Sequence, residues 1–177
     1  MVELDRRQLS GLEWHQESAF GRKYNLKSGD SVLAEVAFVK SLGTLAEART
    51  AGNGWSFKRK GVFSTSVGAR PLGEEREVAT YQPNWTSSKG LLRLESGEEF
   101  QLRSANFWDS EWLLSDAEGA PVLRFHNRGF LKHGAQIDIE AKGRSHPQLE
   151  LLLTLTWYLL VLHQMDSTAV TAVVAGA

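Results

Sequence analysis

The chain has 177 residues, which is the length of one ordinary domain. Hydrophobic residues make up 42% and charged residues 23% of it, and this balance excludes a wholly disordered chain. The 20 lysines and arginines nearly match the 21 aspartates and glutamates, so the formal charge of −1 argues against a dedicated nucleic-acid-binding protein. The absence of cysteine excludes disulfides, thiolate metal sites and cysteine nucleophiles.

Residues 1–7 contain acidic side chains and have no apolar run behind them, so they lack the pattern of a secretory signal. The lack of cysteine also suits a reducing compartment. We therefore expect a cytoplasmic protein, either free or attached to the periphery of a membrane.

Short runs of alternating apolar and polar residues follow one another from about residue 22 to residue 141. In residues 91–95 (LLRLE), for example, leucines alternate with Arg93 and Glu95, which predicts a strand with one buried face. Similar runs occupy residues 32–38, 100–103, 122–125 and 137–140. Hairpin turns with glycine are predicted at residues 27–30, 96–98, 117–119 and 127–129. The spacing of these turns predicts roughly ten to twelve antiparallel strands.

A single open sheet of that size would curl or split, and closure removes its two exposed edges. The strands therefore predict a barrel or a sandwich. No helical pattern alternates with them, which argues against a parallel α/β sheet.

The pattern changes at residue 147, where an apolar run without a polar face begins and predicts a helix over residues 147–165. Ser145 is the expected cap, Pro147 lies in the first turn, and Glu150 lies near the positive end of the helix. His163, Gln164 and Asp166 end the apolar run. The run spans roughly 24 Å against about 30 Å of membrane hydrocarbon, which favours burial in protein over a tilted or re-entrant membrane segment.

The apolar faces of the strands and the all-round apolar helix satisfy each other if the helix lies inside a closed barrel. About twelve strands enclose enough space for a helix. We therefore predict a mainly β fold, with a closed antiparallel barrel of about twelve strands around a hydrophobic C-terminal central helix. Residues 1–177 form one domain in this interpretation, with residues 1–20 as an N-terminal segment. Because the helix is expected to fill the barrel, binding is expected on the outer surface, the rims or the N-terminal segment.

This order of elements resembles the tubby C-terminal-like superfamily, and most closely its branch of LURP-one-related and phospholipid scramblase-like proteins. The resemblance covers about residues 20–166. It is carried by residues 55–61 (WSFKRKG), 90–94 (GLLRL), 116–124 (DAEGAPVLR) and 159–166 (LLVLHQMD).

The resemblance implies a twelve-stranded barrel around a central helix and, from the tubby-like members, phosphoinositide binding by basic residues on the barrel surface. Scramblases are linked to calcium through an acidic segment before the C-terminal helix. In this chain that segment, residues 141–147 (AKGRSHP), is basic, so calcium-driven activity is not expected.

The densest basic run is the candidate binding site. On a strand, Lys58 and Lys60 share one face, while Arg59 lies on the face of Trp55 and Phe57. Two or three cations with backbone N–H groups can hold a phosphate headgroup. The alternative is a charged strand exterior that keeps the barrel soluble. The predicted anion-binding residues are Lys58, Lys60, Arg59, Arg70, Arg22 and Lys23.

Other chemistry has weaker signals. No histidine pair has a zinc spacing, although His126 and His133 could approach across a hairpin, so no metal and no cofactor are expected. There is no Gly-x-Ser-x-Gly motif, and residues 52–54 (GNG) indicate a type I′ or similar hairpin turn. The six tryptophans indicate either wall packing on the helix or an exposed ligand platform. The tryptophans are Trp14, Trp55, Trp85, Trp108, Trp112 and Trp157.

The leading hypothesis is a non-enzymatic binding module for phosphoinositide or another anionic phospholipid. A protein-interaction scaffold with no lipid ligand is the alternative, and an enzyme of unknown type is the third. No nucleic acid and no transmembrane span are expected.

Overall fold

The computed structural model describes residues 1–5, 9–18, 21–61, 65–84, 89–106, 108–127 and 134–175, with side chains described as far as residue 168. These ranges contain twelve strands and two helices. The strands are β1 (Leu12–Gln16), β2 (Lys23–Ser28), β3 (Ser31–Phe38), β4 (Ala46–Thr50), β5 (Gly54–Lys60), β6 (Ser66–Pro71), β7 (Ala79–Pro83), β8 (Lys89–Leu94), β9 (Glu99–Ser104), β10 (Glu111–Asp116), β11 (Pro121–Asn127) and β12 (Gly134–Ile139). The helices are α1 (Ala141–Ser145) and α2 (Leu149–Ala175).

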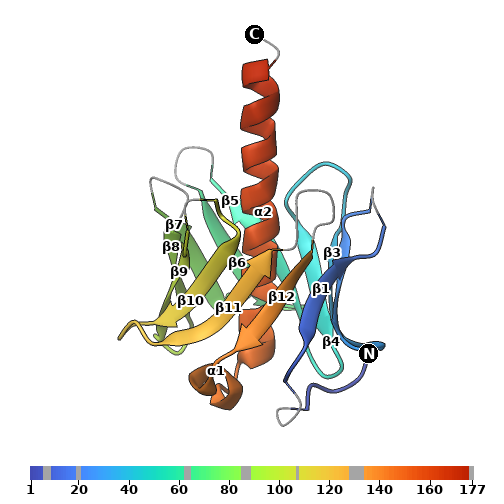
Figure 1. The fold of residues 1–177 in the computed structure, drawn as a ribbon, viewed down its shortest axis with the longest axis vertical. Helices are drawn as coiled ribbons and strands as arrows, with labels where there is room; N and C mark the ends of the chain where they lie inside the picture. The colour runs from blue at the N-terminus through green and yellow to red at the C-terminus, as the bar shows by residue number, and fades with distance from the viewer. Residues whose placement is uncertain are drawn as a thin grey trace.

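The strands form one closed antiparallel barrel in which each strand pairs with its neighbours in the chain (Figure 1). This confirms the predicted fold class. The barrel closes through β1, where Leu12 lies between Ile137 of β12 and Ser28 of β2. Residues 1–20, which were expected as an N-terminal segment, thus contain the strand that closes the barrel. β1 is short, but its alternation places Leu12 and Trp14 in the core and covers the edges of β2 and β12.

The inward face of the barrel is apolar, as the alternation predicted. Leu92, Leu94, Phe100 and Leu102 of β8 and β9 each expose 3% or less of their surface. Four of the tryptophans are also buried, which confirms the packing interpretation for them. They are Trp14, Trp55, Trp112 and Trp157. Trp85 lies outside the described residues.

α2 lies along the barrel axis (Figure 1), and every residue from Leu151 to Leu162 is buried. Trp157 of the helix stacks on Trp14 of β1 with ring centroids 5.3 Å apart, and Tyr158 packs on Phe57 of β5 at 5.4 Å. The all-round apolar pattern is therefore explained by burial inside protein. In the described part of the chain, no helix is both long and apolar enough to cross a membrane.

The start of the central helix differs from the prediction. Ser145 lies in the separate short helix α1 and does not cap α2, and Pro147 lies between the two helices. His146 ends α1 in an extended conformation, which is the one that a following proline favours. Its ring then caps the next turn, because Nδ1 accepts a hydrogen bond from the backbone N–H of Gln148 at 3.1 Å.

Glu150 lies in the first turn of α2, as predicted, and its carboxylate ties the helix to the β4–β5 turn. The carboxylate oxygen Oε2 accepts hydrogen bonds from Thr50 Oγ1 at 2.8 Å and from Asn53 Nδ2 at 2.7 Å. The turn is the expected hairpin connection, but it is not of type I′. The Thr50 backbone N–H donates to the Asn53 carbonyl, so Ala51 and Gly52 are the central residues, and neither has the positive φ that type I′ requires.

α2 continues to Ala175, well past the expected end at residue 165. Its 27 residues span about 40 Å, and its last turns project beyond the barrel (Figure 1). The polar residues His163, Gln164 and Asp166 mark the point where the helix leaves the barrel, not the end of the helix. Outside, the hydroxyls of Ser167 and Thr168 donate to the carbonyls of His163 and Gln164 at 3.0 and 2.9 Å.

Candidate functional site

The two ends of the barrel differ in character. We call the end at which α2 leaves the barrel the exit rim, and its described loop residues are 17–18, 21–22, 39–45, 61, 65, 84, 105–106 and 108–110. We call the opposite end the α1 rim, which consists of α1 and the turns at residues 29–30, 51–53, 72–78, 95–98 and 117–120. The α1 rim exposes many carboxylates. They belong to Asp30, Glu74, Glu75, Glu95, Glu98 and Glu118.

The exit rim exposes large apolar side chains instead. Leu42 in the β3–β4 loop is 89% exposed and Trp108 in the β9–β10 loop is 82% exposed. Val39 and Met165 are also exposed at this rim. The two loops lie on opposite sides of the closed barrel, so Leu42 and Trp108 flank the point where α2 leaves. Several such side chains on one rim indicate an interaction surface, whereas a single one would not.

The β9–β10 loop holds Trp108 at its outer side. Asn106 Oδ1 accepts a hydrogen bond from the Ser110 backbone N–H at 3.1 Å, and Asn127 Nδ2 donates to the Asp109 carbonyl at 2.8 Å. Asp109 has a φ of 52°, in the left-handed region. Its carboxylate lies 3.1 Å from His163 Nε2 on α2. The loop thus fixes Asp109 against the helix and leaves Trp108 in solvent.

The predicted basic run lies on β5 with the expected alternation. Lys58 is exposed on the outer face, while Arg59 lies on the inner face beside α2. Lys60 forms an ion pair with Glu77. Arg70, which lies on neighbouring β6, bonds Glu75 at 2.8 Å and reaches Glu77 at 3.4 Å. The structure therefore brings Lys58, Lys60 and Arg70 to one wall, and two carboxylates neutralise most of their charge.

Arg22 and Lys23 lie apart from that wall, with β3 and β4 between. Lys23 is paired with Glu35 at 2.9 Å and with Glu17 at 3.5 Å. Arg22 lies over the Phe38 ring, 4.0 Å from its centroid. The six predicted residues thus form three separate groups and not one headgroup site.

Two cations that the sequence analysis did not single out form a pair next to the exit rim. Lys89 of β8 lies directly opposite Arg103 of β9, and both side chains are exposed. Among the described residues neither has an ion-pair partner, and the nearby Glu111 is bonded to Arg124 instead. Like charges directly opposite each other destabilise an antiparallel pair. An anion bound between them would remove that repulsion.

The sequence contained a signal for this pair. The predicted hairpin turn at residues 96–98 pairs residues that are equally distant from it, and both Lys89 and Arg103 are seven positions from Ser96. The residues are too far apart in the chain to stand out as a basic run. Register, and not local charge density, identifies them.

Three contacts hold α2 where it passes the exit rim. Arg59 forms a bidentate ion pair with Asp166, at 2.9 and 2.7 Å. His163 lies beside Asp109 and packs against the Trp112 ring with centroids 4.8 Å apart. On another side, Arg22 Nη2 lies 3.1 Å from Met165 Sδ. His163 therefore makes these contacts from the middle of α2, not from its C-terminus.

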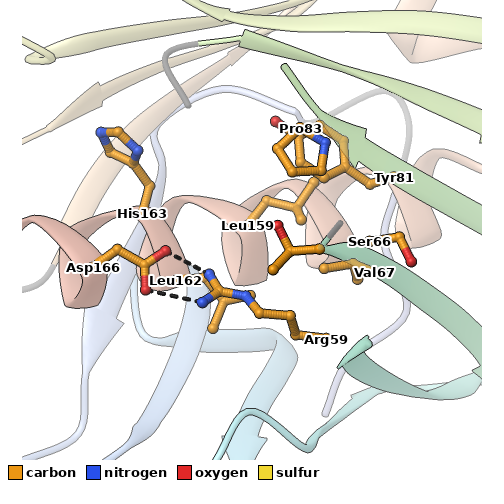
Figure 2. Close-up of a pocket in the computed structure, with 10 residues that line it drawn as sticks. Arg59, Ser66, Val67, Tyr81, Pro83, Leu159, Leu162, His163 and Asp166 are labelled. Atoms are coloured by element: carbon orange, nitrogen blue, oxygen red, sulfur yellow. Dashed lines mark hydrogen bonds and ion pairs between the residues drawn. The ribbon is translucent and has the colours of Figure 1, made fainter. Parts of the chain in front are cut away.

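A cavity of about 220 Å³ opens at the exit rim between α2 and the wall of β5, β6 and β7 (Figure 2). α2 contributes Leu159, Leu162, His163 and Asp166, whose spacing places them on one face of the helix. The wall contributes Arg59, Thr65, Ser66, Val67, Tyr81 and Pro83. The cavity lies at one of the rims, which are among the places where binding was expected if the helix fills the barrel.

The lining residues offer no arrangement for nucleophilic catalysis. Figure 2 shows Ser66 on the opposite side of the cavity from His163, whose Nε2 is directed to Asp109. The cavity therefore does not bring Ser66 and His163 together. Among the described residues, no group of three or more histidine and carboxylate side chains could hold a metal ion. His126 lies 3.0 Å from Asp138, and His133 is outside the described residues.

No family model, curated protein or solved structure matches this chain. The resemblance to the tubby C-terminal-like superfamily therefore stays a prediction. The barrel and its central helix are shown by the structure itself.

Millimolar calcium is expected to leave the Tm unchanged. Calcium requires about six to eight oxygen ligands, and the two carboxylates that directly precede α1 in the chain are already engaged. Asp138 lies beside His126, and Glu140 lies 4.0 Å from Arg124 Nε. Thermal unfolding with calcium or with EDTA measures this. An upward shift of several degrees that disappears in the double variant Asp138→Asn with Glu140→Gln would contradict it, because a ligand specific for the folded state raises the Tm.

Proposed function

We propose that the protein is a non-enzymatic binding module that attaches peripherally to membrane surfaces containing anionic phospholipid, through its exit rim. One observation carries this proposal: in the described part of the chain, cations without an ion-pair partner lie at or next to that rim, together with large exposed apolar side chains. The cations are Lys40, Lys89 and Arg103, and the most exposed apolar residues are Leu42 and Trp108.

This combination suits a lipid surface for two physical reasons. An anionic membrane attracts each nearby lysine or arginine by about 1 kcal/mol. Tryptophan has an apolar body and a polar N–H, and it is favoured at the boundary between headgroups and hydrocarbon. The exposed carboxylates of the α1 rim would be repelled by the same surface. The charge difference between the rims therefore orients the barrel with α2 directed toward the membrane.

The outer wall of Lys58, Lys60 and Arg70 is the competing location for the anion site. We favour the exit rim because Glu75 and Glu77 neutralise that wall, whereas Lys89 and Arg103 have no carboxylate partner among the described residues. A protein-interaction scaffold is the second candidate function, since exposed apolar side chains also suit a protein partner. Dependence of binding on lipid charge separates the two.

Co-sedimentation with lipid vesicles tests the proposal. We expect binding to phosphatidylcholine vesicles that also contain phosphatidylserine or a phosphoinositide, little binding to phosphatidylcholine alone, and weaker binding as salt increases. The double variant Lys89→Gln with Arg103→Gln should bind roughly 30-fold more weakly, which corresponds to about 1 kcal/mol for each cation removed.

Two controls locate the site. The double variant Lys58→Gln with Lys60→Gln removes the same charge from the neutralised wall, and Lys27→Gln removes a cation near the α1 rim. Both should bind as the parent does. A larger loss in the Lys58 and Lys60 variant than in the Lys89 and Arg103 variant would move the site to β5. Absence of binding by the parent to every anionic vesicle would overturn the proposal and leave the scaffold hypothesis.

A further inference from the structure

Arg59 at the cavity of the exit rim is occupied by a carboxylate from the chain itself. Its Nη1 donates to Asp166 Oδ1 at 2.9 Å and its Nη2 to Oδ2 at 2.7 Å (Figure 2). This two-bond arrangement is the one in which a guanidinium recognises a free carboxylate. The hydrogen bond to Asp166 also raises the pKa of Arg59, so the cation is present at every physiological pH.

The two partners differ in how firmly they are held. The Arg59 side chain is 25% exposed and is fixed by β5 beside α2, whereas the Asp166 side chain is 56% exposed on the part of α2 that has left the barrel core. Asp166 can therefore turn into water and be hydrated there. Solvent-exposed ion pairs contribute little to stability, so a second carboxylate can compete for the same guanidinium.

Beyond Arg59 the cavity is lined mainly by apolar side chains, with Thr65, Ser66 and His163 as its polar members. Leu159, Leu162, Val67 and Pro83 line it, and Tyr81 contributes its ring. Burial raises the pKa of Tyr81 to about 12, so its phenol stays neutral and can donate a hydrogen bond. A ligand that fits this cavity needs a negative end for Arg59 and an apolar body.

The size of the cavity limits the ligand. Its volume of about 220 Å³ is roughly seven times the ~30 Å³ that a water molecule occupies in the liquid. Covalently bonded atoms pack more closely than water, so the cavity has room for on the order of ten non-hydrogen atoms. It is smaller than the ~300–1,000 Å³ of pockets for drug-sized ligands.

We propose that this cavity binds a small amphipathic carboxylic acid, whose carboxylate replaces Asp166 on Arg59 and whose apolar body packs against Leu159 and Val67. The site requires no membrane, so it is independent of the membrane attachment proposed above. Asp166 acts as an internal competitor for the ligand in this arrangement.

Titration of the full chain with four soluble probes, followed by calorimetry and by NMR shifts of residues near Arg59, tests the ligand class. Hexanoate should bind saturably. Acetate has the carboxylate without the hydrocarbon chain, and 1-hexanol has the hydrocarbon chain without the charge. Each should bind at least tenfold more weakly than hexanoate. Equal binding of 1-hexanol would overturn the role of Arg59. Equal or tighter binding of hexyl phosphate would overturn the preference for a carboxylate.

Two variants test the exchange at Arg59. Asp166→Asn removes the internal competitor and should tighten hexanoate binding at least threefold, while Arg59→Gln should weaken it at least tenfold. Arg22→Gln changes another arginine that contacts α2 but does not line the cavity, and it should bind as the parent does. Unchanged or weaker binding in Asp166→Asn would overturn the proposal, and that variant keeps the test decisive if Arg59→Gln fails to fold.

Discussion

Replacement of Leu155 by aspartate is expected to prevent the protein from folding. Leu155 lies in the middle of the buried part of α2 and has 0% of its surface exposed. A carboxyl group there would have no water, and the side chains around it are overwhelmingly apolar. Its burial should cost more than about 4–5 kcal/mol, which is comparable to the whole stability of many domains. Far-UV circular dichroism and thermal unfolding measure the outcome.

Two companion variants separate the charge from the loss of packing. Leu155→Ala should fold with a free energy of unfolding lowered by about 2–5 kcal/mol, because it leaves a cavity in the barrel. Ser167→Asp introduces the same charge on the exposed part of the same helix and should change stability by about 0.5 kcal/mol or less. A folded Leu155→Asp protein with the parent's Tm would show that α2 is not enclosed by the barrel.

The architecture was predictable because the strands alternate and the helix is a long apolar run, and each of these is a strong signal in the sequence. Strands such as β8 alternate cleanly, and the run from Leu151 to Leu162 has no polar side that could face water. The boundaries were less predictable. Polarity reports where α2 leaves the barrel, but helical hydrogen bonds continue without burial as far as Ala175. Pro147 suits a first turn by its φ, yet it also forces His146 into an extended conformation and separates α1 from α2.

The candidate site was less predictable than the fold, because it depends on contacts between distant parts of the chain. Alternation on β5 correctly placed Arg59 on the inner face. Its partner Asp166 is 107 positions away, and the rotation of a helix that is apolar on every side cannot be derived from its sequence. Likewise, Glu77 neutralises Lys60 because the two side chains meet across β6 over Gly68, where a larger side chain would contact both of them. The Lys89–Arg103 pair was accessible in principle, since it requires only the register of one hairpin.

The ring stack between Trp157 and Trp14 leads to the second large stability prediction. Trp157 is 1% exposed, lies parallel to Trp14 at 5.3 Å and meets the edge of Tyr24 at 5.6 Å. Trp157→Ala should lower the free energy of unfolding by about 3–5 kcal/mol, because it empties a large volume between α2 and the barrel wall. For a chain of this length that corresponds to a Tm lower by about 6–20 °C. Urea unfolding of both proteins measures the difference.

The indole nitrogens of the stacked tryptophans add a second test of this prediction. Within the described structure, the Nε1 groups of Trp157 and Trp14 are buried without a hydrogen-bond partner, and an unsatisfied buried donor costs about 1–3 kcal/mol. Trp157→Phe removes that donor while it keeps an aromatic ring, so it should cost less than half as much as Trp157→Ala. Trp108→Ala is the matched control, because Trp108 is 82% exposed and its loss should change stability by about 0.5 kcal/mol or less. Equal losses in Trp157→Ala and Trp108→Ala would contradict the stacked core, whereas equal losses in Trp157→Phe and Trp157→Ala would show that the indole N–H is satisfied. A small loss in Trp157→Phe would mean that the stack stabilises the barrel through its apolar area and in spite of its polar atoms.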